Sequence, residues 1–163
     1  MTTDNTPDAD APALRYLDDL QPGDRFTSPE HALDEAQIKA FALQFDPQPF
    51  HLDDEAAKGT LFGGLAASGW HTAALTMRML VKGGAPLAGG IIGAGGEIAW
   101  PKPTRPGDVL HVESEIVSVT PSKSRPDRGM VVVSSTTLNQ HGDVLQQSTF
   151  KLVVPRRAAS TAP

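Results

Sequence analysis

The segment whose residue types could carry chemistry runs from Phe45 to His71 and reads FDPQPFHLDDEAAKGTLFGGLAASGWH. It begins with a carboxylate, Asp46, and an imidazole, His51, five residues apart on a loop that contains two prolines. Because proline reduces the freedom of a loop, the two groups can be held around one water molecule and exchange protons with it. The same spacing also suits an ordinary turn with a capping acid, and spacing alone favours that second interpretation.

The other polar and glycine residues that follow have structural interpretations. Asp53 and Asp54 precede two alanines and suit the cap of a short helix. Together with His51 they would supply fewer converging ligands than a metal site usually has, so we expect no metal. Gly63 and Gly64 lack the surrounding pattern of a phosphate-binding loop.

Two helices are predicted on either side of the loop. Residues 33–45 have the apolar spacing of an amphipathic helix, at Ile38, Phe41, Ala42 and Phe45. Asp34 with Gln37 resembles a capping box at its start, and Pro47 ends it near Phe45, because a residue before proline disfavours the helical conformation. Residues 65–81 are apolar nearly all round, which is typical of a buried helix.

A curved sheet is the natural cover for such a helix in a chain of 163 residues. Four segments rich in Val, Ile and Thr, bounded by Pro or Gly clusters, are predicted strands: residues 89–100, 108–119, 129–140 and 144–155. The turn around Gly142 predicts that the last two form an antiparallel hairpin. A short strand, two helices and then a run of strands make an α+β fold.

Composition limits the classes of function. The chain is 39% hydrophobic and 20% charged, with a net charge of -5 and no cysteine, so we expect no nucleic-acid or membrane partner and a cytoplasmic location. No apolar run is long enough to cross a membrane. We expect one domain over residues 17–155, with flexible tails at 1–16 and 156–163.

Three short motifs resemble the signature of the MaoC-like hydratases, also called (R)-specific enoyl-CoA hydratases. They are the helix ending with Phe41-Ala42, the segment DPQPFHLD at 46–53 and the segment FGGLAASG at 62–69. The later WPKPTRPGD, at 100–108, is similar to the family's strand-turn-strand. The resemblance implies the hot-dog fold, in which a curved antiparallel sheet wraps around a long central helix.

The resemblance also implies a hydro-lyase that adds water across the 2,3-double bond of a 2-enoyl-CoA, or the reverse dehydration. Asp46 and His51 would hold the water, and the N–H of Gly69 at the start of the buried helix would stabilise negative charge on the thioester oxygen. Ser68 could add a weaker hydrogen bond. Gln48 stands where the family usually has Asn, and Ser68 where it often has His; these departures bear on substrate preference.

The remaining expectations concern substrate and partners. Coenzyme A is part of the substrate, no cofactor is expected, and the family fold implies a homodimer. Cations that could bind the coenzyme A phosphates are Lys102, Arg105, Lys123, Arg125 and Arg128, for each of which solvated loop charge is an equal alternative. His71 suits a core or pocket-wall position, and His111 and His141 suit the surface. The alternatives are a hot-dog acyl-CoA thioesterase and a non-catalytic acyl-CoA-binding paralogue.

Overall fold

The structure, a computed structural model, describes residues 12–158. The predicted tails therefore fall largely outside it, since residues 1–11 and 159–163 are not described. In the described part of the chain, no helix combines the length and the apolar character needed to cross a membrane. In chain order, the elements are η1 (Leu17–Asp19), β1 (Arg25–Thr27), β2 (His31–Ala32), α1 (Glu35–Phe45), α2 (Pro49–Leu52), α3 (Asp54–Lys58), α4 (Gly69–Met79), the π-type turn η2 (Leu80–Gly84), β3 (Ile92–Ala99), β4 (Val109–Pro121), β5 (Arg128–Leu138) and β6 (Val144–Pro155).

The strands form one antiparallel sheet in the order β1-β4-β5-β6-β3, with β2 also paired to β4. The four predicted long strands are confirmed, and β5 and β6 form the predicted hairpin. Gly142 in its turn has φ of 78°, a conformation that glycine adopts without strain. Strand β3 lies at one edge of the sheet, and nearly all of its residues are exposed.

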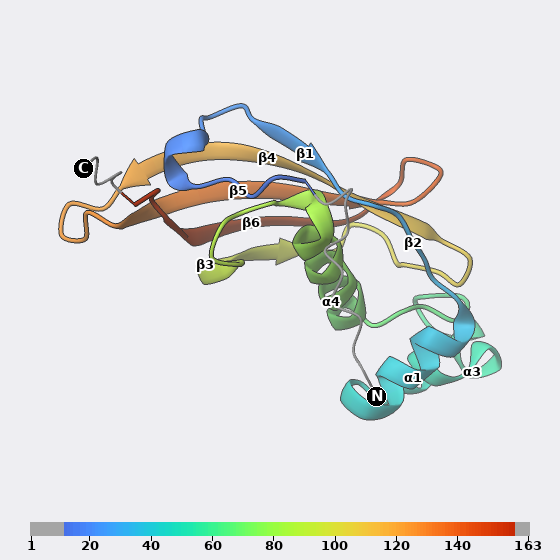
Figure 1. Ribbon diagram of the computed structural model, residues 1–163. Coiled ribbons are helices and arrows are strands. Elements are labelled where there is room, and N and C mark those ends of the chain that lie inside the picture. The colour runs from blue at the N-terminus through green and yellow to red at the C-terminus, as the bar shows by residue number, and fades with distance from the viewer. Residues whose placement is uncertain (1–11, 159–163) are drawn as a thin grey trace, which may run out of the picture.

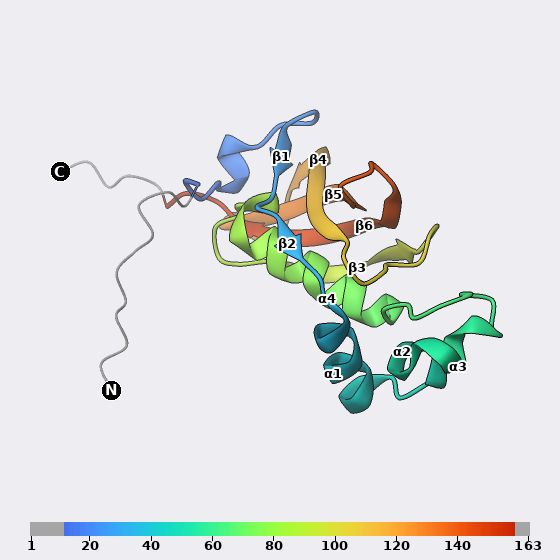
Figure 2. The same ribbon diagram turned by 90° about the vertical axis from the view of Figure 1, so that its right-hand side faces the viewer.

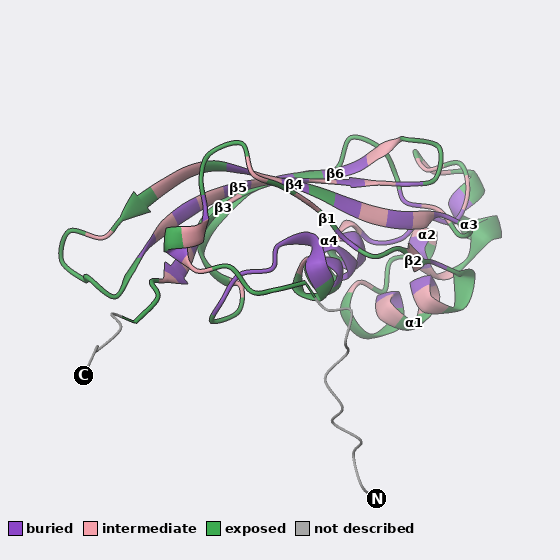
Figure 3. Cartoon of the chain, turned by 45° about the horizontal axis from the view of Figure 1, so that its top comes forward, coloured by how far each residue is buried: buried purple, intermediate pink, exposed green. Residues whose placement is uncertain are grey.

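Helix α4 lies against the concave face of the curved sheet, which confirms the predicted hot-dog arrangement (Figures 1 and 2). The side that faces the sheet is buried, as Figure 3 shows, and includes Leu75 and Met79. The opposite side exposes Trp70, Met77 and, just beyond the helix, Val81. The helix predicted to be buried is therefore buried on the side toward the sheet and exposed on the other, because the sheet covers α4 from one side only.

Helix α1 begins and ends where the sequence predicts. The Asp34 side chain accepts a hydrogen bond from the N–H of Gln37 (2.8 Å), and the last helical residue is Phe45. Ile38 and Ala42 are buried, but Phe45 is 68% exposed. Figures 1 and 2 show the reason: α1, α2 and α3 extend beyond the sheet, so the end of α1 has no sheet to pack against.

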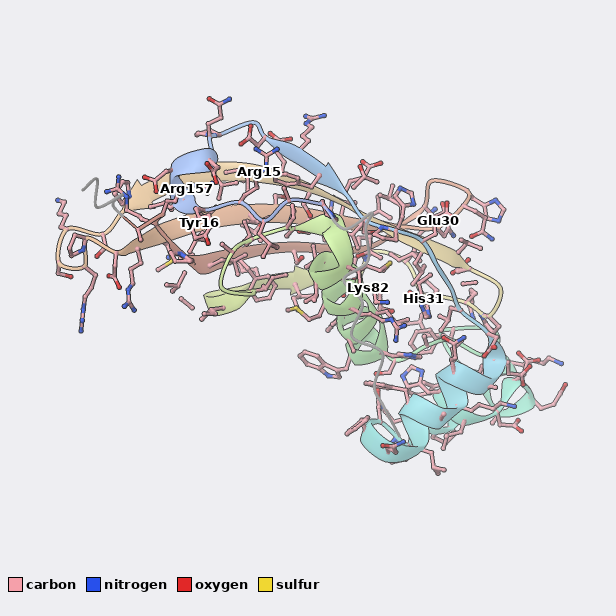
Figure 4. The ribbon with its side chains drawn as sticks, viewed as in Figure 1. Arg15, Tyr16, Glu30, His31, Lys82 and Arg157 are labelled. Carbon is pink, nitrogen blue, oxygen red and sulfur yellow. The ribbon has the colours of Figure 1, made fainter. Side chains whose placement is uncertain are left out.

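The described residues of the predicted tails make specific contacts with the domain. The backbone N–H of Arg15 donates to the carbonyl of Pro86 (2.7 Å). The guanidinium of Arg157 pairs with Asp19 and lies 4.6 Å from the ring centroid of Tyr16 (Figure 4). These contacts bring the two ends of the described chain together.

Two buried pairs of threonine hydroxyls attach α4 to the rest of the domain. Thr72 bonds to Thr104 (2.8 Å), in the segment between β3 and β4, and Thr76 bonds to Thr137 on β5 (2.7 Å). All four side chains are buried, with Thr137 fully inaccessible. Each hydroxyl therefore satisfies the other, and the pairs fix the position of α4 on the sheet.

Replacement of one partner should be more harmful than replacement of both. Thr76→Val leaves the Thr137 hydroxyl buried without this partner and should lower the free energy of unfolding by about 1–3 kcal/mol. The double variant Thr76→Val/Thr137→Val should recover most of that loss. Urea unfolding measures both, with Thr120→Val on an exposed strand position as the control. Additive losses in the double variant would contradict the pairing.

Candidate active site

Asp46 is the C-cap residue of α1, and the end of this helix fixes its position in the site. The N–H of Asp46 closes the helix by donating to the carbonyl of Ala42 (2.9 Å), and the chain then turns at once into α2, which starts at Pro49. Proline suits this first helical position because its missing N–H would have no partner within the helix. The connection is therefore short and stiff, and it places His51 on α2 directly beside Asp46.

His51 is buried, and its orientation is set by a backbone carbonyl. Its Nδ1 lies 2.7 Å from the carbonyl oxygen of Ala66, in the segment that leads into α4. A carbonyl only accepts hydrogen bonds, so Nδ1 carries a proton and donates it. In the neutral ring Nε2 is then an acceptor, and it lies 3.3 Å from the Oδ2 atom of Asp46.

Three groups hold the Asp46 carboxylate in its ionised form. Burial alone would raise its pKa, but hydrogen bonds from Ser68 and Gln48, and the positive charge of His51 when that ring is protonated, lower the pKa below its usual 3.8. The Gln48 amide donates to Oδ1 of Asp46 at 2.6 Å. The amide that replaces the family's usual Asn thus holds the loop, as its chemistry predicts.

When the His51 ring is neutral, Asp46 and His51 together form a pair of hydrogen-bond acceptors. An ionised carboxylate and an unprotonated Nε2 side by side repel each other's lone pairs, but a water molecule can donate one proton to each. The pair can then act as general base and general acid on that water. The structure therefore brings the sequence-predicted pair together, with Asp46 Oδ2 and His51 Nε2 3.3 Å apart.

Ser68 and Gly69 open α4 next to this pair. The fully buried Ser68 is the N-cap of α4, and its hydroxyl oxygen accepts a hydrogen bond from the N–H of Trp70 (3.2 Å). Its side chain is also one of the groups that lower the pKa of Asp46, so Ser68 supports the carboxylate as well as the start of α4. Gly69 is the first helical residue, where an N–H has no partner within the helix.

The glycine at position 69 is also required by packing. A Cβ atom built there would lie 2.9 Å from two ring atoms of Trp100, closer than side chains approach one another. Sequence reasoning had placed Trp100 in a turn motif and missed this contact. The available signal was that the chain has only two tryptophans, Trp70 at the start of the predicted helix and Trp100 at the end of a strand.

The loop before α4 is held by Arg105 and Asp54. The guanidinium of Arg105 donates to the carbonyls of Phe62, Gly64 (2.8 Å) and Leu65 (3.2 Å). The Asp54 carboxylate accepts from the N–H of Leu65 (2.9 Å). These bonds fix the segment that presents the Ala66 carbonyl to His51, so Arg105 supports the loop before α4.

The short helix α3 has the predicted cap in part. Asp53 is its N-cap and accepts from the N–H of Ala56 (2.8 Å). Asp54 instead bridges to Leu65, as described above. Within residues 12–158, no group of three His, Cys, Asp or Glu side chains is placed to hold a metal ion.

The structure does not bring together the five cations predicted to bind phosphates. Lys102 pairs with Asp143, and Arg105 binds the loop before α4; both lie between β3 and β4. Lys123, Arg125 and Arg128 lie at the other end of β4, whose 13 residues span roughly 40 Å. Arg128 also pairs with Asp127 (2.9 Å). The two groups therefore cannot bind one coenzyme A phosphate together.

An apolar cavity of about 190 Å³ lies between α4 and the sheet. Ala73, one helical turn beyond Gly69, lines it, and so does the buried side chain of Gln146. Its other walls include Met77, Leu80, Val133, Phe150 and Leu152. The cavity therefore extends from near the start of α4 along the helix and can take a hydrocarbon chain.

His71 packs in the interface between α1 and α4, which agrees with the predicted core position. Its ring stacks on Phe41 with centroids 4.5 Å apart, and its Nδ1 is buried without a hydrogen-bond partner. Burial, together with the nearby His31, lowers the pKa of His71 from 6.5 to about 4. His111 and His141 lie on an outer strand position and in an exposed turn.

The chain is similar to known proteins both in sequence and in structure. Residues 19–139 match the MaoC like domain family. The uncharacterized protein YdeM of Bacillus subtilis is 32% identical over 127 residues, which cover 76% of this chain and 87% of that protein. A crystal structure of a MaoC-like dehydratase from Rhodospirillum rubrum is 66% identical, with a TM-score of 0.86 over 88% of this chain and 98% of that one. An (R)-hydratase from A. caviae involved in PHA biosynthesis, 24% identical, shares the fold, with a TM-score of 0.68 over 83% of this chain and 98% of that one.

The buried His71 should make stability fall as the solution becomes acidic. Between pH 6.5 and about 4 the unfolded chain binds a proton at His71 that the native state does not, so the contribution is constant above 6.5 and is lost as pH falls through this window. His71→Phe keeps the stacking on Phe41. It should reduce the change in the urea midpoint of unfolding between pH 7.5 and pH 4. His141→Asn, at an exposed turn, should leave the slope as it is. An unchanged slope in His71→Phe would contradict the assignment.

Proposed function

This chain belongs to the MaoC-like domain family, and on that premise we propose that it adds water across the 2,3-double bond of a 2-enoyl-CoA thioester or removes it in reverse. The observation that carries the proposal is the pair of acceptors, Asp46 Oδ2 and His51 Nε2, 3.3 Å apart beside the start of α4. Both can bind the same water molecule, and the helix terminus next to them favours negative charge.

The proposed reaction uses each of these groups once. The water oxygen bonds to C3 as one member of the pair takes a proton from it. The electron pair of the double bond moves toward the thioester carbonyl, and the N–H of Gly69 stabilises the charge on its oxygen. C2 then takes a proton from the pair. Water addition transfers no electrons to or from a cofactor, so the proposal invokes coenzyme A only as part of the substrate.

The competing function, hydrolysis of the thioester, would direct the activated water at the carbonyl carbon instead. That reaction needs one carboxylate to activate water, whereas this site has two acceptors that can take and return protons. Hydration uses both, so the geometry favours it. Following the enoyl absorbance and free thiol separately distinguishes the two reactions.

We also propose that a second copy of the chain covers the exposed side of α4 and the edge of β3. Within the described residues, β3 pairs with β6 alone, which leaves backbone groups at its other edge for another strand. Exposed apolar side chains lie on the same two elements, at Trp70, Met77 and Ile92. An edge strand beside exposed apolar groups supports a homodimer.

Loss of either acceptor should abolish hydration. Asp46→Asn and His51→Ala should each lower kcat for crotonyl-CoA by several orders of magnitude, because the two groups act as one unit. The assay is loss of enoyl absorbance with no release of thiol. Asp127→Asn and His141→Ala, both exposed positions, are the matched controls. Full activity in both site variants would refute the proposed site, and thiol release would indicate a thioesterase.

A bulkier residue in the wall of the apolar cavity should shift the preference for acyl chain length. Ala73→Leu fills cavity space one helical turn beyond Gly69 and should lower kcat/KM for 2-octenoyl-CoA about tenfold more than for crotonyl-CoA. The same substitution at an exposed position of α1, Ala40→Leu, should leave the ratio unchanged. An equal effect on both substrates would show that the acyl chain lies elsewhere.

A further inference from the structure

Trp100 lies over the residue that carries the proposed oxyanion donor. It follows the last residue of β3, and its indole occupies the space where a side chain at position 69 would begin. Three ring atoms, Cδ2, Cε2 and Cε3, lie 2.9, 2.9 and 3.2 Å from that Cβ position. The packing contact and the proposed oxyanion contact therefore fall on the same glycine.

The indole is held in one orientation from two sides. Its Nε1–H donates to Oε1 of Gln146 at 2.9 Å, and Gln146 is only 2% exposed. The ring of Trp70 meets it edge-on, with centroids 5.3 Å apart. Trp100 is nevertheless 40% exposed, so part of the ring remains open to a bound molecule. Gln146 also lines the apolar cavity, which connects the indole to the proposed acyl site.

The direction of the Cα–Cβ bond places the indole beside the reacting carbons. In a helix this bond tilts toward the N-terminus, and that is the end at which a thioester oxygen would accept the N–H of Gly69. A thioester oxygen bound to that N–H would bring the carbonyl carbon and its neighbour C2 close to the residue that the indole covers. A substituent on C2 would meet the ring, whereas an unsubstituted planar enoyl group would pass it.

We propose that Trp100 is a specificity-determining residue that selects acyl thioesters without a substituent on C2, and that Gln146 is the positioning residue that holds it. The inference rests on the proposed hydratase function and deepens it. It defines the substrate class as C2-unbranched enoyl thioesters.

The first test compares two substrates that differ by one methyl group, crotonyl-CoA and 2-methyl-2-butenoyl-CoA. Trp100→Ala should raise the ratio of kcat/KM for the branched over the unbranched substrate about tenfold or more. Trp100→Phe should raise it less, and Gln146→Met, which removes the acceptor but keeps the volume, should shift it in the same direction. Val117→Ala, at an exposed apolar position on β4, is the control and should leave the ratio unchanged.

The second test does not require turnover. Because the chain has two tryptophans, Trp70→Phe leaves Trp100 as the single emitter of indole fluorescence. Butyryl-CoA, which has no double bond to hydrate, should change the emission of this variant. It should change the emission of Trp100→Phe, in which Trp70 alone emits, much less.

The outcomes separate this inference from the proposed function. If the wild-type protein hydrates no enoyl thioester but butyryl-CoA changes Trp100 emission, the contact stands and the proposed function fails. The inference is overturned if hydration proceeds and the Trp100 variants lower kcat/KM for both substrates in equal proportion. It is also overturned if these variants dissociate the oligomer without changing the ratio of the two kcat/KM values. Should Trp100→Ala fail to fold, Trp100→Phe and the fluorescence titration decide between these outcomes.

Discussion

The hydrogen bond from His51 Nδ1 to the carbonyl of Ala66 is the interaction on which the site depends, because it joins two segments that the chain builds separately. One segment is the α1–α2 connection with Asp46, and the other leads into α4. In the neutral ring a donor at Nδ1 makes Nε2 an acceptor, and in that form His51 and Asp46 present two acceptors to one water molecule. This one hydrogen bond thus sets the position of the His51 ring and the nitrogen that carries the proton in its neutral form.

Ser68 supports the second member of the pair, the Asp46 carboxylate. It caps α4 through its hydroxyl oxygen and helps to lower the pKa of Asp46, so the start of the central helix and the ionised acid share one side chain. Behind it, Arg105 and Asp54 bind the backbone of the preceding loop. These charged side chains bind backbone carbonyls and an N–H group, and the bonds hold a glycine-containing loop in one conformation.

Much of the fold could be predicted, because its signals are local. The strands of the sheet have β-branched runs between turn residues, α1 has a cap and a helical apolar period, and proline ends it. The exposed side of α4 could not be predicted in this way. Residues 65–81 are apolar nearly all round, and this pattern does not reveal whether the sheet of the same chain or a second copy covers Trp70 and Met77. Phe45 illustrates the same limit. It lies on the apolar face predicted for α1, but α1 extends beyond the sheet and the Phe45 side chain is exposed.

The sequence by itself determined the proximity of Asp46 and His51, because a proline-limited loop of a few residues leaves the two side chains little freedom to separate. It also determined a glycine at the start of the central helix. Only the tertiary structure decided what these groups do there. The tautomer of His51, the ionisation of Asp46, the support from Ser68 and Arg105 and the cover from Trp100 all arise between residues distant in the chain or in different elements. Hydrogen bonds and ring contacts of this kind depend on distances of a few ångströms, and spacing along a sequence does not encode such distances between separate elements.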